Sequence, residues 1–256
     1  MKIFPRQLML LALMLFNSVM VNAEQFNVLL ITRTMGWHHE SINEAVDAFR
    51  KLATKHHFKL TWEENVDLVI TEQKLQDFDV LVFLLTSGDI LNPTQQQAVQ
   101  NFIQSGKGFV GVHSASDTEY DWPWYNGLVG HMFHIHPVIQ TGNLRVHSRK
   151  FPGLERMPDS LWWTDEWYQF GPAQSKNLNY ILTVDENSYD PIADWGEKKG
   201  NGMGKFHPIA WYQEYDGGRS FYTGLGHLPA AYSDRLLMEH IYGGLFWAAT
   251  GKGLKK

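Results

Sequence analysis

Short apolar runs alternate with amphipathic segments along the first half of the chain. Three of these runs, 26–32, 80–85 and 109–112, are apolar almost throughout, as expected of parallel strands that are covered on both faces. The segments between them repeat apolar residues at helical spacing, and two begin at a helix-start signal: a capping box at 41–44 and the pair Asn92-Pro93. Strands that alternate with helices of this length are typical of a doubly wound parallel sheet. We therefore expect the three runs to be neighbouring parallel strands.

The second half of the chain is richer in expected strands than in helices. The turn Asp216-Gly217-Gly218 is typical of a hairpin, and a final helix is expected from about 233 to 249. No repeat or linker interrupts the pattern, so we expect one domain at 24–251 and a short tail at 252–256. The predicted fold is α/β, a flavodoxin-like doubly wound parallel sheet with extra antiparallel strands in its second half. The candidate strands of that half are 137–147, 179–184, 208–215 and 219–225.

The first 23 residues have the pattern of a secretory signal. Lys2 and Arg6 give a positive start, an apolar run follows at 8–16, and Ala23 is a small residue before a cleavage point. The apolar run is too short to span a membrane comfortably, and no later segment approaches a span. We therefore expect export to the periplasm or the cell exterior, and a mature chain that begins near Glu24.

Charge and cysteine content narrow the function classes. The 256-residue chain has a net charge of −5, which becomes −7 without residues 1–23, because that segment holds two basic and no acidic residues. Without a basic patch, nucleic acid is not an expected partner. The chain has no cysteine, which excludes disulfides, thiolate metal ligands and a cysteine nucleophile. The sequence does not indicate an oligomeric state.

Polar residues gather where the apolar run at 109–112 ends. His113 follows this run directly, and ligands bind at the carboxyl edge of such sheets. We expect His113 to act as a base, a metal ligand or a hydrogen-bond donor; a buried histidine bound to a carbonyl is the alternative. The candidate substrate-binding residues that follow it are Ser114, Asp117, Glu119, Tyr120 and Trp122.

An acidic pair lies within an aromatic segment at 162–168. Asp165 and Glu166 are adjacent, so in an extended chain they point to opposite sides and only one easily faces a crevice. Apolar surroundings would raise the pKa of that carboxyl and suit it to general acid catalysis; Glu166 is slightly preferred, and a solvated pair is the alternative. Aromatic rings of the kind that stack on sugars occur here and elsewhere, at Trp122, Trp124, Tyr125, Trp167, Tyr168 and Trp195.

Histidines cluster at two further places. His131, His134 and His136 are weak candidates for metal ligands, since histidine binds metals readily but their spacing matches no closed site. A polar loop with structural histidines is the alternative. His38 and His39 follow the first expected strand, and we expect one of them to reach the crevice and contact substrate.

Several motifs, taken in order, closely resemble those of the ThuA-like (trehalose-utilisation) family. They are GWHHES at 36–41, TSGD at 86–89, HSASDTEYDWPW at 113–124, DEWY at 165–168, HPIAW at 207–211 and GH at 226–227. The resemblance covers 26–250 and implies a variant of the class I glutamine amidotransferase fold. Amidotransferases carry a nucleophilic cysteine at a strand-to-helix elbow, where this chain has His113. Their later histidine resembles His227, but Pro229 replaces the glutamate expected two residues on, so thiol chemistry is ruled out.

The resemblance implies a role in the breakdown of trehalose or a related disaccharide at the level of a keto-sugar. An isomerase, lyase or hydrolase would use His113, His227 and Glu166 or Asp165 in acid–base or metal-assisted chemistry. A divalent metal is left open, and no nicotinamide is expected because no G-x-G-x-x-G follows the first strand. The alternative is a non-catalytic carbohydrate-binding domain. An enzyme should bring both histidines and one carboxylate to a common point, whereas a binding domain should keep the histidines apart.

Overall fold

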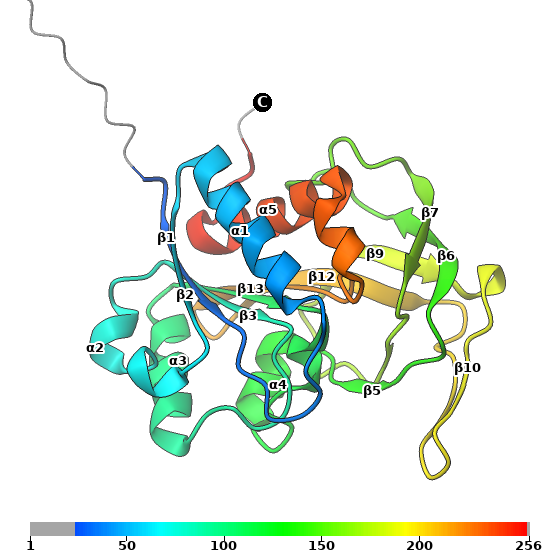
Figure 1. Cartoon of the computed structure of the whole chain (residues 1–256), viewed down its shortest axis with the longest axis horizontal. Coiled ribbons are helices and arrows are strands. Elements are labelled where there is room, and N and C mark those ends of the chain that lie inside the picture. The colour runs from blue at the N-terminus through cyan, green and yellow to red at the C-terminus, as the bar shows by residue number, and fades with distance from the viewer. Residues whose placement is uncertain (1–23, 255–256) are drawn as a thin grey trace, which may run out of the picture.

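The computed structural model describes residues 24–254, so the expected signal at 1–23 lies outside the described residues. Its main sheet has nine strands in the order β2-β1-β3-β4-β13-β12-β9-β6-β7 (Figure 1). The first five strands are parallel to one another and the last four alternate in direction. The predicted α/β sheet with antiparallel strands added by the second half of the chain is therefore confirmed.

The parallel half of the sheet contains the apolar runs of the sequence. Its strands are β2 (Lys59–Glu63), β1 (Asn27–Ile31), β3 (Val80–Leu84), β4 (Gly108–Val112) and β13 (Gly218–Thr223). β1, β3 and β4 are neighbours, as predicted, and every residue of β3 and β4 is buried. Burial on both faces explains why these strands read as unbroken apolar runs.

Helices cover both faces of the parallel half (Figure 1). On one face lie α1 (Ile42–His56) and α5 (Arg235–Thr250), whose buried side chains join the core cluster of Val28, Val82 and Val110. The other face carries α2 (Glu72–Leu75), α3 (Pro93–Gln104), α4 (Pro123–Val129) and the 3-10 turn η1 (Val66–Leu68).

The two expected helix starts differ in their caps. Asn92 and Gln95 form a reciprocal capping box at the start of α3. Ser41 makes no such bond, so the expected box at 41–44 is wrong. Ser41 already has helical backbone angles (φ −78°, ψ −4°), and its buried hydroxyl has no partner among the described residues. An N-cap side chain reaches the first turn from an extended backbone, which this serine lacks.

The antiparallel half consists of β12 (His207–Tyr215), β9 (Asn179–Asp185), β6 (Gln140–Val146) and β7 (Ser160–Asp165). The turn from β12 to β13 has positive φ at Asp216 and Gly217, as a tight hairpin requires. Two small ladders flank this half. β5 (Phe133–Ile135) pairs with β8 (Gln169–Phe170), and β10 (Ile192–Asp194) pairs with β11 (Lys199–Asn201) in a hairpin that projects from the body (Figure 1).

Short 3-10 turns complete the described chain: η2 (His113–Asp117), η3 (Glu186–Ser188) and η4 (Pro229–Ser233). Across residues 24–254, no helix has both the length and the apolar character needed to cross a membrane.

Candidate functional site

Three loops meet at the carboxyl edge of the parallel half, and each contributes one histidine. His39 lies between β1 and α1, His113 begins η2 directly after β4, and His227 follows β13. Because β1, β4 and β13 belong to one parallel array, their carboxyl ends share an edge. The common edge is the one expected from the sequence.

His113 stands at the elbow between β4 and η2 with φ of +52°, in the left-handed region that a residue with a side chain rarely adopts. Its ring is fully buried. Nδ1 lies 2.8 Å from the carbonyl oxygen of Gly224 and donates its hydrogen to it, because a carbonyl only accepts. This bond orients the ring so that Nε2 faces Glu166 and His227.

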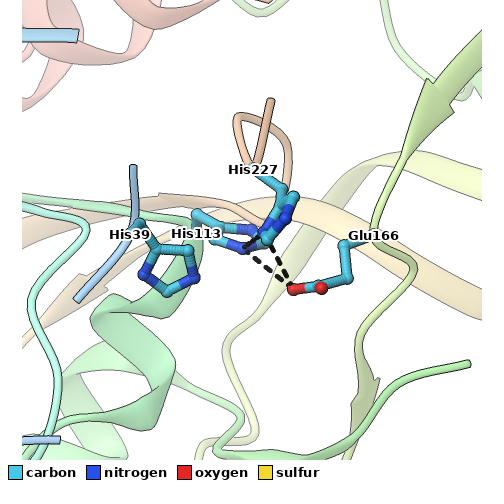
Figure 2. Close-up of side chains that lie close together, drawn as sticks. All are labelled: His39, His113, Glu166 and His227. Atoms are coloured by element: carbon cyan, nitrogen blue, oxygen red, sulfur yellow. Dashed lines mark hydrogen bonds and ion pairs between the residues drawn. The ribbon is translucent and has the colours of Figure 1, made fainter. Parts of the chain in front are cut away.

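Glu166 lies in the segment between β7 and β8, and its side chain faces His113 and His227 from the antiparallel half. Its Oε2 lies 3.0 Å from Nδ1 of His227 and 3.4 Å from Nε2 of His113. The two histidine nitrogens are 3.3 Å apart. Figure 2 shows the three groups turned toward one another. The other oxygen of Glu166, Oε1, lies 3.3 Å from Nε2 of His136.

His39 completes the group, which we call the His–Glu cluster: His39, His113, Glu166 and His227. The His39 ring is buried, and its centroid is 4.9 Å from that of His113 and 5.3 Å from that of His227. One ligand atom from each of the four residues lies within 4.8 Å of all the others. Imidazole and carboxylate are both common ligands of divalent metals, so the cluster has the composition and spacing to hold one.

Burial and mutual contact set the protonation of the cluster. Burial alone would raise the pKa of Glu166, but hydrogen bonds from His113 and His227 outweigh it and lower the pKa. The expected raised pKa of this carboxyl is therefore wrong. Burial, followed by the neighbouring His113 and His227, lowers the pKa of His39 to about 2, which keeps its ring neutral. Burial lowers the pKa of His227 less than the hydrogen bond and charge of Glu166 raise it.

Asp165, the other candidate acid, is fully buried and binds backbone rather than facing the cavity. Its Oδ1 accepts hydrogen bonds from the backbone N–H groups of Glu166 (2.9 Å) and His227 (3.0 Å). Its Oδ2 accepts from the backbone of Gly226 (2.9 Å) and the indole of Trp163 (3.0 Å). With its four acceptor contacts taken, Asp165 ties together the two chain segments that carry Glu166 and His227.

A cavity of about 430 Å³ opens beside the His–Glu cluster. Trp37 and Trp195 line it with 70% and 50% of their surface exposed, so both rings are accessible to a ligand. Tyr168 lies deeper, its ring 4.2 Å from that of His113. Burial raises the pKa of Asp117, whose carboxylate accepts a hydrogen bond from Tyr120 (2.6 Å). The lining residues are Trp37, His39, Asp117, Phe133, His136, Glu166, Tyr168, Trp195 and His227.

Several expected substrate-binding residues lie elsewhere. The carboxylate of Glu119 is buried and accepts hydrogen bonds from the backbone of Ile90 and Leu91, both 2.7 Å, so it anchors a loop. The ring of Trp122 stacks on other aromatic side chains, and Trp167 is fully buried with its indole N–H bonded to a backbone carbonyl. Ser114 is also buried and contacts the cavity only through His39, 3.4 Å away.

The histidines at 131–136 do not come together as a metal site. His131 is buried between the carbonyl of Gly171 and the hydroxyl of Tyr180, both at 2.8 Å. His134 points outward from β5 because side chains alternate along a strand. Of the three, His136 lines the cavity, where it contacts Glu166. His38 likewise points away, exposed and 3.1 Å from the hydroxyl of Thr34, whereas its neighbour His39 enters the cluster.

Trp37 and Phe133 line the cavity although sequence reasoning did not single them out as site residues. Trp37 carries a signal that would have identified it, since it lies beside His38 and His39 in a loop that follows a buried strand. Phe133 carries none, because its place depends on the pairing of the three-residue strand β5 with β8.

Solved structures with the same fold include two ThuA-like proteins. The one from Bacteroides uniformis has a TM-score of 0.74 at 20% identity and covers 91% of this chain and 95% of its own. The one from Parabacteroides merdae has a TM-score of 0.70 at 19% identity, with 90% and 92% covered. A β-galactosidase from Bacillus circulans sp. alkalophilus shares the fold over 31% of its length (TM-score 0.53, 12% identity, 88% of this chain).

A search of the curated proteins finds no match. The sequence does match the trehalose-utilisation family (ThuA) over residues 27–248, nearly all of the described chain. This chain belongs to the trehalose-utilisation family.

Proposed function

We propose that this protein is an enzyme that acts on a disaccharide or its keto form, with the cavity beside the His–Glu cluster as its active site. The family supports a role connected with carbohydrate. The observation that carries the proposal is the convergence of His113, His227 and Glu166, whose facing atoms are 3.0–3.4 Å apart beside a cavity with aromatic walls. Aromatic walls with a few convergent polar groups are typical of small-molecule sites.

This geometry favours an enzyme over a carbohydrate-binding domain. A domain that only binds sugar needs an aromatic platform and hydrogen-bonding groups at the surface. It has no need of buried histidines turned toward a carboxylate, which cost stability because buried ionisable groups lose hydration. Here His39 and His113 are both buried and both turned toward Glu166 and His227. Such an arrangement is characteristic of a catalytic centre.

The chemistry that suits a keto-sugar begins with removal of a proton from the carbon next to the ketone. Asp117 lines the cavity with a raised pKa, which suits it to accept and return that proton. Negative charge then develops on the ketone oxygen and needs a donor or a cation. His227 also lines the cavity, and because its Nδ1 is turned toward Glu166 and His113, its Nε2–H is the donor for that oxygen.

Return of the proton to the neighbouring carbon would give an isomerase. When the glycosidic oxygen lies on the next carbon, its C–O bond can break instead: the oxygen leaves with the second sugar, takes up the abstracted proton as an alcohol, and leaves a double bond in the keto-sugar. That reaction is a lyase reaction, and addition of water to the double bond would make the net reaction a hydrolysis. The test is to incubate the purified protein with a panel of disaccharides and their 3-keto forms and to analyse the products. We expect turnover of a keto form by the wild type and by His38→Ala, whose ring points away from the cavity. Binding without turnover of any sugar in the panel would instead establish the binding domain.

We also propose that the protein is exported and that its mature chain begins near Glu24. The support is the charged start, the apolar run at 8–16 and Ala23. N-terminal sequencing of protein from a periplasmic or culture-medium fraction should give Glu24 or a close neighbour. An intact Met1 chain confined to the cytoplasm would contradict the proposal.

A further inference from the structure

We infer that the His–Glu cluster binds one divalent first-row transition-metal ion, through three histidine nitrogens and one carboxylate oxygen. The inference deepens the proposed function, because a metal ion at this place would supply the positive charge that a ketone oxygen requires. It rests on the ligand atoms that face one another in the cluster, on their distances and on the groups that hold them in place.

Three potential ligand atoms face one another. Nδ1 of His113 donates its hydrogen to the carbonyl of Gly224, so Nε2 is the ring nitrogen that is turned toward Oε2 of Glu166, 3.4 Å away. Nδ1 of His227 lies 3.0 Å from the same oxygen and 3.3 Å from Nε2 of His113. A cation placed among the three atoms would contact all of them.

The distances are those of a coordination shell. Metal–nitrogen and metal–oxygen bonds of roughly 2.0–2.2 Å place neighbouring ligand atoms about 2.8–3.1 Å apart in octahedral geometry and about 3.3–3.6 Å apart in tetrahedral geometry. The three separations among His113, Glu166 and His227 are 3.0, 3.3 and 3.4 Å. The ligand atom of His39 lies within 4.8 Å of the others. Ordinary side-chain contraction around an ion would bring it into the shell.

Three of the four ligands are also held from behind, as metal ligands usually are. The carbonyl of Gly224 fixes the ring of His113, and the buried Asp165 binds the backbone of both Glu166 and His227. His136 occupies Oε1 of Glu166, which leaves Oε2 for the ion. A group that served only to pack the fold would not need the outer contacts to orient its lone pairs inward.

The donor set selects the kind of ion. Mg²⁺ and Ca²⁺ take oxygen ligands, whereas imidazole suits Zn²⁺, Co²⁺, Ni²⁺, Fe²⁺ and Mn²⁺ to different degrees. His39, Glu166 and His227 line the cavity, so the ion would be reachable from it. A six-coordinate ion with four protein ligands keeps two positions, which suit a ligand with two adjacent oxygens. The ketone and neighbouring hydroxyl of a keto-sugar are such a pair.

Metal titration of the untagged mature chain tests the inference without any substrate. After treatment with a chelator, the protein should bind one Zn²⁺ or Co²⁺ per chain in calorimetry, and Co²⁺ should give visible d–d absorption bands. Mg²⁺ and Ca²⁺ should not compete. Glu166→Gln, which nearly preserves shape, and His39→Ala should each weaken binding at least about tenfold. Asp165→Asn should weaken it about 10–100-fold through the backbone that it holds.

His38→Ala is the matched control, because His38 is adjacent to His39 but turned toward Thr34, and its affinity should equal that of the wild type. Circular dichroism spectra will show whether each variant is folded. Failure of the folded wild type to bind a stoichiometric ion, or equal affinity in Glu166→Gln and wild type, would overturn the inference. Sugar turnover by a wild type that binds no ion would overturn it too, yet leave the proposed function intact. Tight metal binding without sugar turnover would support the inference and count against the proposed function.

Discussion

The parallel and antiparallel halves of the sheet contribute to the site in different ways. In the parallel half, β3 and β4 are buried at every residue and helices cover both faces. In the antiparallel half, exposed and covered residues alternate along β7, and aromatic side chains such as Trp162 stand open to solvent. The parallel half is thus a packed frame with three histidines at one edge. The antiparallel half places the carboxylate of Glu166 and part of the cavity lining against that edge.

The site lies where the two halves meet. His39, His113 and His227 come from the loops after β1, β4 and β13, whereas Glu166 and Trp195 come from the antiparallel half and its projecting hairpin. Neither half holds the full set of groups that line the cavity. Substitutions in different places should therefore give different losses. We expect a loss of catalysis at the seam, where His227 and Glu166 meet, a loss of stability in the parallel core, and a loss of affinity at the outer wall of the cavity, formed by Trp37 and Trp195.

The largest expected effect is on catalysis at the seam. His227→Ala and Glu166→Gln should each lower kcat/KM on the sugar that the wild type consumes by about 10³-fold. The first variant loses the donor for the ketone oxygen, and the second loses the carboxylate charge that holds the His227 ring. Steady-state kinetics measures this, with His38→Ala as the control. Wild-type activity in His227→Ala or in Glu166→Gln would show that the chemistry occurs elsewhere.

The next effect is on stability and separates the two halves. Phe83 in β3 is fully buried, and Phe83→Ala should lower the free energy of unfolding by about 3–5 kcal/mol. Trp162 in β7 is 65% exposed, and Trp162→Ala should change it by less than about 0.5 kcal/mol. Urea unfolding gives both values. Equal losses would mean that the antiparallel half is packed as tightly as the frame.

A third prediction uses a histidine inside the frame. Burial lowers the pKa of His240 on α5 to about 3 from 6.5, and in the part of the chain that the structure describes neither ring nitrogen has a partner. Between pH 6.5 and pH 3 the unfolded chain takes up a proton on His240 while the folded chain does not. The free energy of unfolding is therefore unaffected by protonation of this histidine above pH 6.5 and decreases as the pH falls toward 3.

Between pH 7 and pH 5 that loss is about 2 kcal/mol. His240→Leu should therefore be less sensitive to acid than the wild type by this amount in urea unfolding at the two pH values. If wild type and variant lost stability in parallel, His240 would not be the group that titrates.

The smallest expected effect is on affinity at the outer wall. Trp37→Ala and Trp195→Ala should each weaken sugar binding about 2–10-fold, since a stacked aromatic ring contributes roughly 0.5–1.5 kcal/mol beyond its buried area. Fluorescence titration measures this, and Trp162→Ala is the control, because its ring lies outside the cavity and its exposure falls between those of Trp195 and Trp37. Equal affinity in all three variants would place the sugar elsewhere.

The sequence predicts the parallel half well, because burial on both faces leaves a local signal. The runs at 80–85 and 109–112 are apolar since no residue of β3 or β4 meets water. The topology then places His113 and His227 at one edge without any knowledge of side-chain contacts. No comparable signal marks the β10–β11 hairpin, whose two strands of three residues mix polar and apolar side chains without a buried run.

The electrostatics of the site could not be predicted from local sequence. The aromatic neighbours of Glu166 suggest a raised pKa, but histidines that follow β4 and β13 lower it. Likewise, the choice between Asp165 and Glu166 depends on the backbone N–H groups of 226–227, which only folding brings to Asp165. The histidines at 131–136 separate because β5 is a strand of three residues that turns His134 outward.

The central claim is that the two halves build one catalytic unit, and a double-mutant cycle tests it most directly. The kcat/KM of His113→Ala, of Glu166→Gln and of the double variant should be measured on the same sugar. The losses of activity caused by removing groups that act as a unit are strongly non-additive. The double variant should therefore have a kcat/KM only a little lower than that of the less active single variant. A loss equal to the product of the two single losses would contradict the claim, because it would mean that His113 and Glu166 act independently.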